Sequence, residues 1–586
     1  MLRILKARLG DTERGLSLVI VIAVGSVLTV FVTIMMSYGL TAYTKAASDE
    51  RWQSAMAAAY AGVEEYQSRL ANEPAYLRYG NPAAAFSATS TVELPPTENP
   101  AFGIGTDGTW AEIPGSAGSA SFRYEVDNSN YIDTGTLRIR STGRVGDATR
   151  TIVADLRQQG FIDFLYFTDY EMQDPQLSGA AASCVRYNWV SSRPSSCGNI
   201  AFGFGDVVNG PMHSNDTIRI CDSRFRGPVT TSNPNAAQRY LPQNSNGTSC
   251  GGQVFDLPGY PSYAPVIGMP QTNTQMRREV RSDLPIDVPR PGCLYTGPTR
   301  ITLNSNGTIT VYSPWTRATR VAGEPASSGT APAACGSLAA LQSPSGATFT
   351  PPENNLIFVQ NVPAVSTDPN FWASSARPTG LNCRGEAGSS IVGNTTSPST
   401  VTGNGIGFPR ADEQAPRNNS YDCRVGDVFV QGTMSGNLTI ASENYIYVTG
   451  DIVYADSQED MLGLVGNNSI FIWNPVRSNG TTLLGNTNRR IDAAMLSVER
   501  TIEVQNFGRG GDRGVLNING AMAQRFRGIV RQTSGGIANG YAKNYVYDPR
   551  LRYTAPPKFL SPVTTTYGIN VWIETERAFD PDGASR

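Results

Sequence analysis

A lone histidine and a short run of carboxylates are the residues of this sequence whose types could support acid–base chemistry or metal binding. His213 is the one histidine in 586 residues, which argues against Ser-His catalysis and against histidine metal sites. The segment "FIDFLYFTDYEMQDP" could provide a carboxylate pair for sugar hydrolysis or a calcium loop. Its acids are Asp163, Asp169, Glu171 and Asp174. Nothing else in the sequence completes such a site, so a strand and turn with acids at its edge is the better interpretation. We predict no catalytic residue, no metal and no cofactor.

Eight cysteines are the second set of chemically active residues. They are Cys184, Cys197, Cys221, Cys250, Cys293, Cys335, Cys383 and Cys423. None precedes residue 184, and no pair has the C-x-x-C spacing of a zinc or redox site. An even number of such cysteines predicts disulfides formed outside the cytoplasm. The connectivity stays open, and pairing in sequential order is the simplest possibility.

Composition indicates several β-rich units. A length of 586 residues suggests about three or four units. Charged residues are 16%, while glycine and proline are frequent at 59 and 38, which suits turn-rich β structure. The net charge of −2 does not favour nucleic acid, and no nucleic-acid partner is predicted.

An uncharged apolar run near the N-terminus is expected to anchor the chain in a membrane, with His213, the acids and the cysteines on the outer side. No charged residue occurs between Leu16 and Thr44. As a helix this run would be about 40 Å long, enough to cross a hydrocarbon core of about 30 Å. Basic residues outnumber acids before it, so the C-terminal part should face outward from the cytoplasmic membrane as a single-pass protein. The run is too long for an ordinary cleaved secretory signal. A plain signal anchor remains a candidate.

The helix continues beyond the apolar run with an amphipathic pattern. Apolar and small residues recur at three and four spacing; they are Ala55, Ala58, Ala59, Gly62, Val63, Tyr66 and Leu70. Small residues let helices approach closely. A membrane anchor does not require this second half, whereas a helix that packs beside its copies in a filament does.

The N-terminal region resembles that of type IV pilins. Gly15-Leu16-Ser17-Leu18-Val19-Ile20 looks like a prepilin-peptidase site cut after the glycine, and "RGLSLVIVIAVGSVLTVFVTIMMS" is similar to PilX-type minor pilins. The resemblance implies a mature, usually N-methylated, Leu16. It also implies three partners, namely other pilins through the helix, prepilin peptidase and the lipid bilayer.

One position departs from the family pattern. Major pilins carry glutamate at the fifth mature position, where this sequence has Ile20. That carboxylate is thought to neutralise the amine of a neighbouring subunit, because a buried charge needs a partner. Its absence weakens the case for processing and favours a tip, initiating or sparse subunit.

Residues 76–160 should form a small pilin-like antiparallel sheet. Apolar and polar residues alternate there, and the hairpin "RSTGRVGDATRTIVADLR" also resembles the last hairpin of PilX-type chains. The apolar positions are Phe122, Tyr124, Val126, Leu137, Ile139, Ile152, Ala154 and Leu156. In the resembling family such a sheet packs on the second half of the helix.

The remaining sequence predicts a large β-rich head. Short β-branched runs broken by Gly or Asn-Gly recur about every ten residues, which favours a parallel β-helix or β-solenoid over a jelly roll or β-sandwich. The fold class is therefore α+β, mainly β, with a disulfide-pinned insertion in the head. The predicted parts are 1–15 leader, 16–75 stem helix, 76–160 pilin-like domain, 161–230 first part of the solenoid, 231–424 Cys/Pro/Gly-rich insertion, 425–540 main solenoid and 541–586 extended C-terminal cap.

These features predict a minor pilin-like subunit of a type IV pilus or related filament. Its head would serve adhesion, with an unknown surface or carbohydrate ligand, or filament initiation. The alternatives are a signal-anchored surface protein unrelated to pili and a β-helix polysaccharide-active enzyme. The enzyme is the weakest, because Asp427, Asp451 and Asp492 do not cluster in the sequence.

Overall fold

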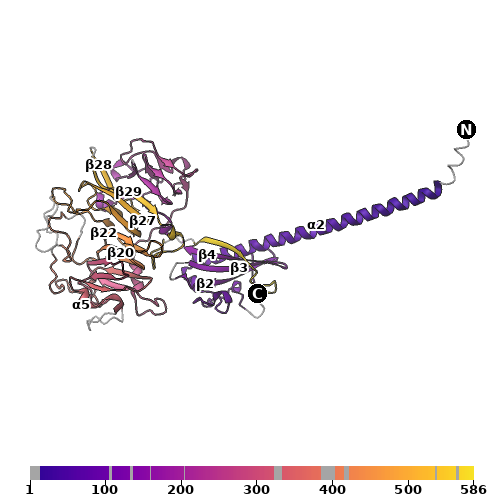
Figure 1. The fold of residues 1–586 in the computed structure, drawn as a ribbon, viewed down its shortest axis with the longest axis horizontal. Helices are drawn as coiled ribbons and strands as arrows, with labels where there is room; N and C mark the ends of the chain where they lie inside the picture. The colour runs from indigo at the N-terminus through magenta and orange to yellow at the C-terminus, as the bar shows by residue number, and fades with distance from the viewer. Residues whose placement is uncertain are drawn as a thin grey trace. The chain divides into compact units, whose positions relative to one another are not determined.

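The chain folds into two compact units, which are described separately (Figure 1). The computed structural model describes residues 13–104, 109–131, 136–158, 160–203, 205–321, 333–383, 403–414, 421–534, 537–562 and 567–586. Residues 1–12 of the predicted leader lie outside this set. The first unit, which we call the stem unit, comprises Met1–Ser129, Leu137–Leu156 and Ile569–Arg586. The second, the head unit, comprises Asn130–Thr136 and Arg157–Gly568.

A single long helix dominates the stem unit. Helix α2 runs from Glu13 to Asn72 over 60 residues, with no proline to interrupt it. Three short 3₁₀ helices follow, namely η1 (Pro74–Arg78), η2 (Ala85–Ser87) and η3 (Pro100–Phe102).

A five-stranded sheet completes the stem unit in the order β1-β2-β3-β4-β30. The strands are β1 (Ala111–Glu112), β2 (Ala120–Asp127), β3 (Thr136–Val145), β4 (Ala148–Gln158) and β30 (Tyr567–Thr575). Strands β2 and β3 are antiparallel, with Phe122 opposite Gly143. A mainly β chain with a long apolar helix and an antiparallel sheet is therefore confirmed. The extended cap expected over 541–586 is not what forms, because β30 joins this sheet.

The head unit is built mainly of parallel strand pairs arranged in three ladders. The first ladder contains, in spatial order, β15 (Cys293–Thr296), β19 (Asn355–Gln360), β21 (Asn437–Ser442), β23 (Met461–Gly466), the C-terminal half of β25 (Arg489–Ser497), that of β27 (Asp512–Phe526), β5 (Tyr166–Tyr170), β8 (Met212–Ser214), β11 (Val229–Thr231) and β14 (Ser262–Tyr263).

The second and third ladders share strand β22. The second contains β16 (Thr299–Leu303), β20 (Val428–Met434), β22 (Ile446–Tyr454), β24 (Ile470–Ile472) and β26 (Ile502–Val504). The third continues from the end of β22 through the N-terminal halves of β25 and β27 to β29 (Ile537–Tyr547), β7 (Val207–Asn209), β10 (Arg224–Phe225) and β13 (Val254–Phe255).

The head unit also contains strands and short helices outside the three ladders. Strands β17 (Ile309–Tyr312), β18 (Ala347–Phe349) and β28 (Arg531–Ser534) pair antiparallel, and β12 (Tyr240–Leu241), β9 (Ile218–Ile220) and β6 (Ala201–Phe202) form a separate small sheet. The helices are η4 (Phe161–Asp163), α4 (Pro175–Ser178), η5 (Ala182–Cys184), η6 (Ser195–Cys197), η7 (Ala236–Gln238), η8 (Thr274–Val280), η10 (Ala333–Cys335), α5 (Leu338–Leu341) and η11 (Pro549–Arg552).

The chain does not build these ladders in sequence order. The chain enters the first ladder at β5, which pairs with the much later β27. From β5 it adds strands to the first and third ladders as far as β14. Residues 264–292 then lead to β15, from which the ladders return to β27. Strands β13 to β16 and β19 therefore belong to the ladders, although the sequence places residues 231–424 in an insertion. The polar loops between these strands hid them, because each strand is short.

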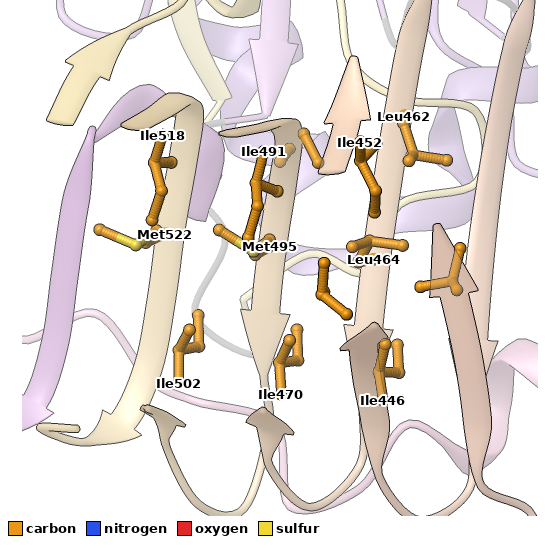
Figure 2. Packing of buried hydrophobic residues seen from close by; sticks show 14 of the residues in the cluster. Ile446, Ile452, Leu462, Leu464, Ile470, Ile491, Met495, Ile502, Ile518 and Met522 are labelled. Carbon is orange, nitrogen blue, oxygen red and sulfur yellow. The ribbon is translucent and has the colours of Figure 1, made fainter. Parts of the chain in front are cut away.

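Aliphatic side chains fill the space between the ladders in aligned rows (Figure 2). Ile446, Ile470 and Ile502 occupy one row, and each is at most 3% exposed. Ile452, Ile491 and Ile518 form a second row and Met495 with Met522 part of a third. Stacking identical positions in successive strands removes these side chains from water, at about 1.5–3 kcal/mol for each fully buried one.

Candidate functional site

The apolar half of α2 is the most exposed hydrophobic surface among the described residues. It is long and apolar enough to cross a membrane by length and composition. Its large apolar side chains from Leu18 to Tyr43 are 46–75% exposed. Ile20, at the position of the missing glutamate, is 53% exposed. Gly15 and Leu16 lie in the helix just before this surface.

Five hydroxyl groups of this half donate hydrogen bonds to carbonyls of the helix itself. The side chains of Ser26, Thr29 and Thr41 donate to the carbonyls four residues earlier, at 2.7–2.8 Å. Thr33 and Thr44 also donate to carbonyls of the preceding turn. A hydroxyl paired in this way can enter lipid without losing a hydrogen bond to water.

The second half of α2 is buried under its own sheet. The predicted stripe faces the strands, and its members other than Gly62 are at most 1% exposed; they are Ala55, Ala58, Ala59, Val63, Tyr66 and Leu70. A Cβ atom added to Gly62 would lie 2.3 Å from Ser141 Oγ, and one added to Gly143 would lie 2.1 Å from the carbonyl oxygen of Ala55. Gly143 thus lies directly against the backbone of α2, and Gly62 lies against the Ser141 side chain. One helix therefore presents a bare apolar half and a half already covered.

Strand β30 and the segment after it are the part of the stem unit that the sequence analysis missed. The segment lies on the sheet face away from α2, where Thr149 donates to the carbonyl of Phe579 and Ala578 donates to Thr151. Arg123 lies over the Phe579 ring at 4.2 Å. The alternation in "YGINVWIET" was the available signal for a strand.

The four acids of the 161–175 segment do not form an open carboxylate pair. Each is engaged by its own partner in the head unit, and burial raises the pKa of the carboxyl groups of Asp163, Asp169 and Asp174. The partners are the Gly160 N–H for Asp163, Tyr187 and Asn215 for Asp169, Arg527 for Glu171 and the Gln176 N–H for Asp174. These contacts hold a strand and turn in place.

His213 is a buried structural histidine in β8. Its side chain is 0% exposed and stacks on Phe167 at 5.7 Å. Its ring nitrogens contact Thr230 Oγ1 at 2.8 Å and Asn215 Oδ1 at 3.0 Å. Burial lowers the pKa of His213 to about 4, so the ring is neutral at pH 7. In the described part of the chain, no group of three or more His, Cys, Asp or Glu residues could hold a metal ion.

Three further carboxyl groups in the head unit have pKa values near neutral pH. Burial raises the pKa of Glu413 to about 7 and that of Asp427 to about 7. Burial, together with the neighbouring Asp174, raises the pKa of Glu503 to about 8. Glu413 accepts a hydrogen bond from Tyr421 at 2.6 Å, and Asp427 accepts one from Asn444 at 2.6 Å. The sequence around these three residues gave no sign that their side chains are buried.

The eight cysteines form four disulfides in sequential order. These are Cys184–Cys197, Cys221–Cys250, Cys293–Cys335 and Cys383–Cys423. Cys293 of the third disulfide begins β15, and Cys423 of the fourth follows Tyr421. Phe408, Tyr421 and Cys423 pack on Phe429 and Tyr447. Disulfides of this kind persist in oxidising compartments, consistent with an extracellular head.

Comparison with known proteins gives little. No protein-family model matches the chain, and no curated protein matches it. Among solved structures, the competence-associated pilin ComZ from Thermus thermophilus matches over 90% of this chain and 97% of its own, with 11% sequence identity and a TM-score of 0.24. At this TM-score and identity the match establishes no shared fold.

Proposed function

We propose that this chain is a minor pilin-like subunit, anchored by the apolar half of α2 and recruited into a type IV pilus or related filament. The observation that carries the proposal is the division of α2. Residues 18–43 are exposed and largely apolar, while one face of residues 55–70 is buried under the antiparallel sheet. A bilayer can cover the first half before assembly, and the helices of other pilins can cover it afterwards.

The proposal assigns processing to Gly15 and Leu16. Prepilin peptidase would cut after Gly15 and leave Leu16 as the mature residue. Because Ile20 supplies no carboxylate, the new amine of a neighbouring subunit would lack its usual partner in the filament. This supports a position at the tip, in initiation or at low abundance.

We further infer that the three ladders wind as a β-solenoid. Consecutive strands along the chain belong to different ladders. Within one ladder, the inward side chains of neighbouring strands stack in register, as Ile446, Ile470 and Ile502 do in the second (Figure 2). Such a body gives a filament a long, rigid surface for adhesion to a cell surface or carbohydrate. We propose no enzymatic role, because each acid of the 161–175 segment already has a partner.

The mature N-terminus is the first test. Mass spectrometry of the chain from the native membrane or from sheared filaments should find an N-methylated Leu16 that depends on prepilin peptidase. A chain that still begins at Met1 would instead identify a signal-anchored surface protein, and the pilin assignment would be abandoned.

The role of the head is tested by removing it without damaging the stem unit. Since β30 follows the head in the sequence, a truncation after residue 160 would also remove a strand of the sheet. The deletion should join Leu156 to Ile569 through a short Gly/Ser linker. Normal pili that no longer adhere would support an adhesin. Normal adhesion by the remaining pili would show that the head acts in initiation or capping instead.

A further inference from the structure

A cleft in the stem unit combines an aromatic ring with several guanidinium groups. Its volume is about 1070 Å³. Trp52 of α2 and Phe86 line it, together with the arginines and glutamates of β3, β4, β30 and the segment after β30. These residues are Arg140, Arg150, Glu574, Glu576, Arg577 and Arg586. Four positive side chains therefore face two negative ones.

The arginines of this cleft differ in how they are paired. Arg150 bonds Glu574 at 2.6 Å, Arg140 bonds Glu125 and Arg586 bonds Asp580. These three cations are largely neutralised where they lie.

Arg577 has no carboxylate partner among the described residues. Its guanidinium lies over the Trp52 ring, with the central carbon 4.8 Å from the ring centroid. A guanidinium that lies over an indole ring can keep N–H groups free. Those groups can bind two oxygens of one phosphate or carboxylate group. The cleft thus holds one guanidinium without a carboxylate partner, with Glu576 also in its lining.

One exposed aromatic ring, that of Trp52, lines the cleft, and two others lie further along α2 and in β30. Trp52 is 36% exposed, Tyr60 38% and Trp572 40%. The rings of Tyr60 and Trp572 are in edge contact at 4.5 Å. Ile573 beside them is 55% exposed. Trp and Tyr with arginine nearby are the residues that sit at membrane–water interfaces.

The position of Trp52 along α2 fits this chemistry, on the proposed function that residues 16–44 span the membrane. Trp52 follows Thr44 by eight residues (52 − 44), which is about 12 Å of helix. The headgroup layer extends about 5–8 Å beyond the hydrocarbon core. Helical side chains point back towards the N-terminus, so the Trp52 ring covers the turn before its own Cα, about 5 Å closer to the membrane. The Arg577 guanidinium over that ring therefore lies at the edge of the headgroup layer.

We propose that this cleft binds the phosphate of an anionic phospholipid in the outer leaflet of the membrane that anchors the chain. Arg577 binds the phosphate oxygens, and the Trp52 ring holds its guanidinium in place. A free phosphate ion would share the contact with Arg577 but would not be held at the membrane surface.

Lipid binding to the full chain in detergent tests the proposal. Native mass spectrometry would follow retention of dioctanoyl phosphatidylglycerol, dioctanoyl phosphatidylcholine and inorganic phosphate. We expect phosphatidylglycerol to bind at least tenfold more tightly than the other two. R577Q should lose this preference and R577K should retain part of it, since lysine keeps the charge without the fork. R78Q is the matched control, because Arg78 also lies over an aromatic ring, Tyr79, but outside the cleft.

Equal binding of the two lipids, or unchanged selectivity in R577Q, would overturn the proposal. So would phosphate binding as tight as phosphatidylglycerol, which would mark a free-anion site. Carbonate washing of proteoliposomes separates this result from the proposed function. A chain that is washed out lacks the membrane anchor itself, and the cleft proposal fails with it. A chain that stays inserted but shows no lipid preference refutes the cleft alone.

Discussion

Replacing Gly143 by alanine should loosen α2 from its sheet. The added Cβ would lie 2.1 Å from the Ala55 carbonyl oxygen and 2.2 Å from the Ala59 nitrogen. These are backbone atoms in the middle of a helix, so no side chain can rotate away. To restore ordinary van der Waals distances, β3 and α2 must move apart by about 1 Å. A gap of that size forfeits about a quarter to a half of the dispersion energy of the facing atoms.

The expected cost follows from this geometry. Overpacking a tight contact usually costs about 1–3 kcal/mol, and we place this substitution near 3 kcal/mol because the clash is with backbone. Since about 1.4 kcal/mol is a factor of ten, protection of the amides of residues 55–70 against hydrogen exchange should fall about a hundredfold.

Hydrogen exchange with mass spectrometry on the full chain measures this loss in the helix itself. G203A is the control, because a Cβ on Gly203 meets nothing within 4 Å. We expect that variant to match the unmodified chain in both units. Protection of residues 55–70 in G143A that stays within threefold of the unmodified chain would refute the packing argument.

Three further predictions concern the head unit. Because burial lowers the pKa of His213 to about 4, the unfolded chain binds a proton below pH 6.5 that the folded chain does not, and stability falls as the pH drops towards 4. The free energy of unfolding, measured by denaturant titration, should therefore fall by about 1.5 kcal/mol more than that of H213Q between pH 6.5 and pH 5, and parallel curves would contradict this. Glu503, whose pKa burial and Asp174 raise to about 8, stays protonated in the fold, so its contribution is present below pH 4.5 and is lost as the pH rises through 8. E503Q should thus gain about 3 kcal/mol relative to the unmodified chain between pH 5 and pH 8, and no relative gain would show that Glu503 titrates normally. Joint replacement of Cys293 and Cys335 by alanine, which opens a link of sequence separation 42, should lower the free energy of unfolding by about 4 kcal/mol, and a loss below about 1 kcal/mol would be inconsistent with the chain-entropy argument.

Local periodicity was enough to predict the helix and the first strands of the stem unit. The spacing of Ala55, Val63 and Tyr66 marks a buried helical face, and the alternation at Phe122 and Tyr124 marks a strand facing it. Both patterns lie within a few turns or residues of chain, so the sequence alone displays them. The acids near Asp169 were likewise interpreted as part of a strand and turn, since no second group completed a site.

The pairing of strands that lie far apart in the sequence could not be predicted from local patterns. Strand β5 pairs with β27, and β4 shares a sheet with β30, across hundreds of residues. No local pattern records which distant strand is the neighbour. The oriented Arg577 was also invisible, because its meaning depends on Trp52, which lies far away in the sequence but beside it in the stem unit.

The return of the chain to β30 determines when the subunit can be completed. Every residue of the head unit from Arg157 to Gly568 is synthesised after β4 and before most of β30. In synthesis, α2 and the first four strands emerge early, yet their sheet lacks an edge strand until the whole head has been made. A chain stalled or cleaved within the head would therefore leave that edge unpaired and Arg123 without Phe579. Synthesis of the head and completion of the stem are thus coupled in time, so that an incomplete head is accompanied by an incomplete stem.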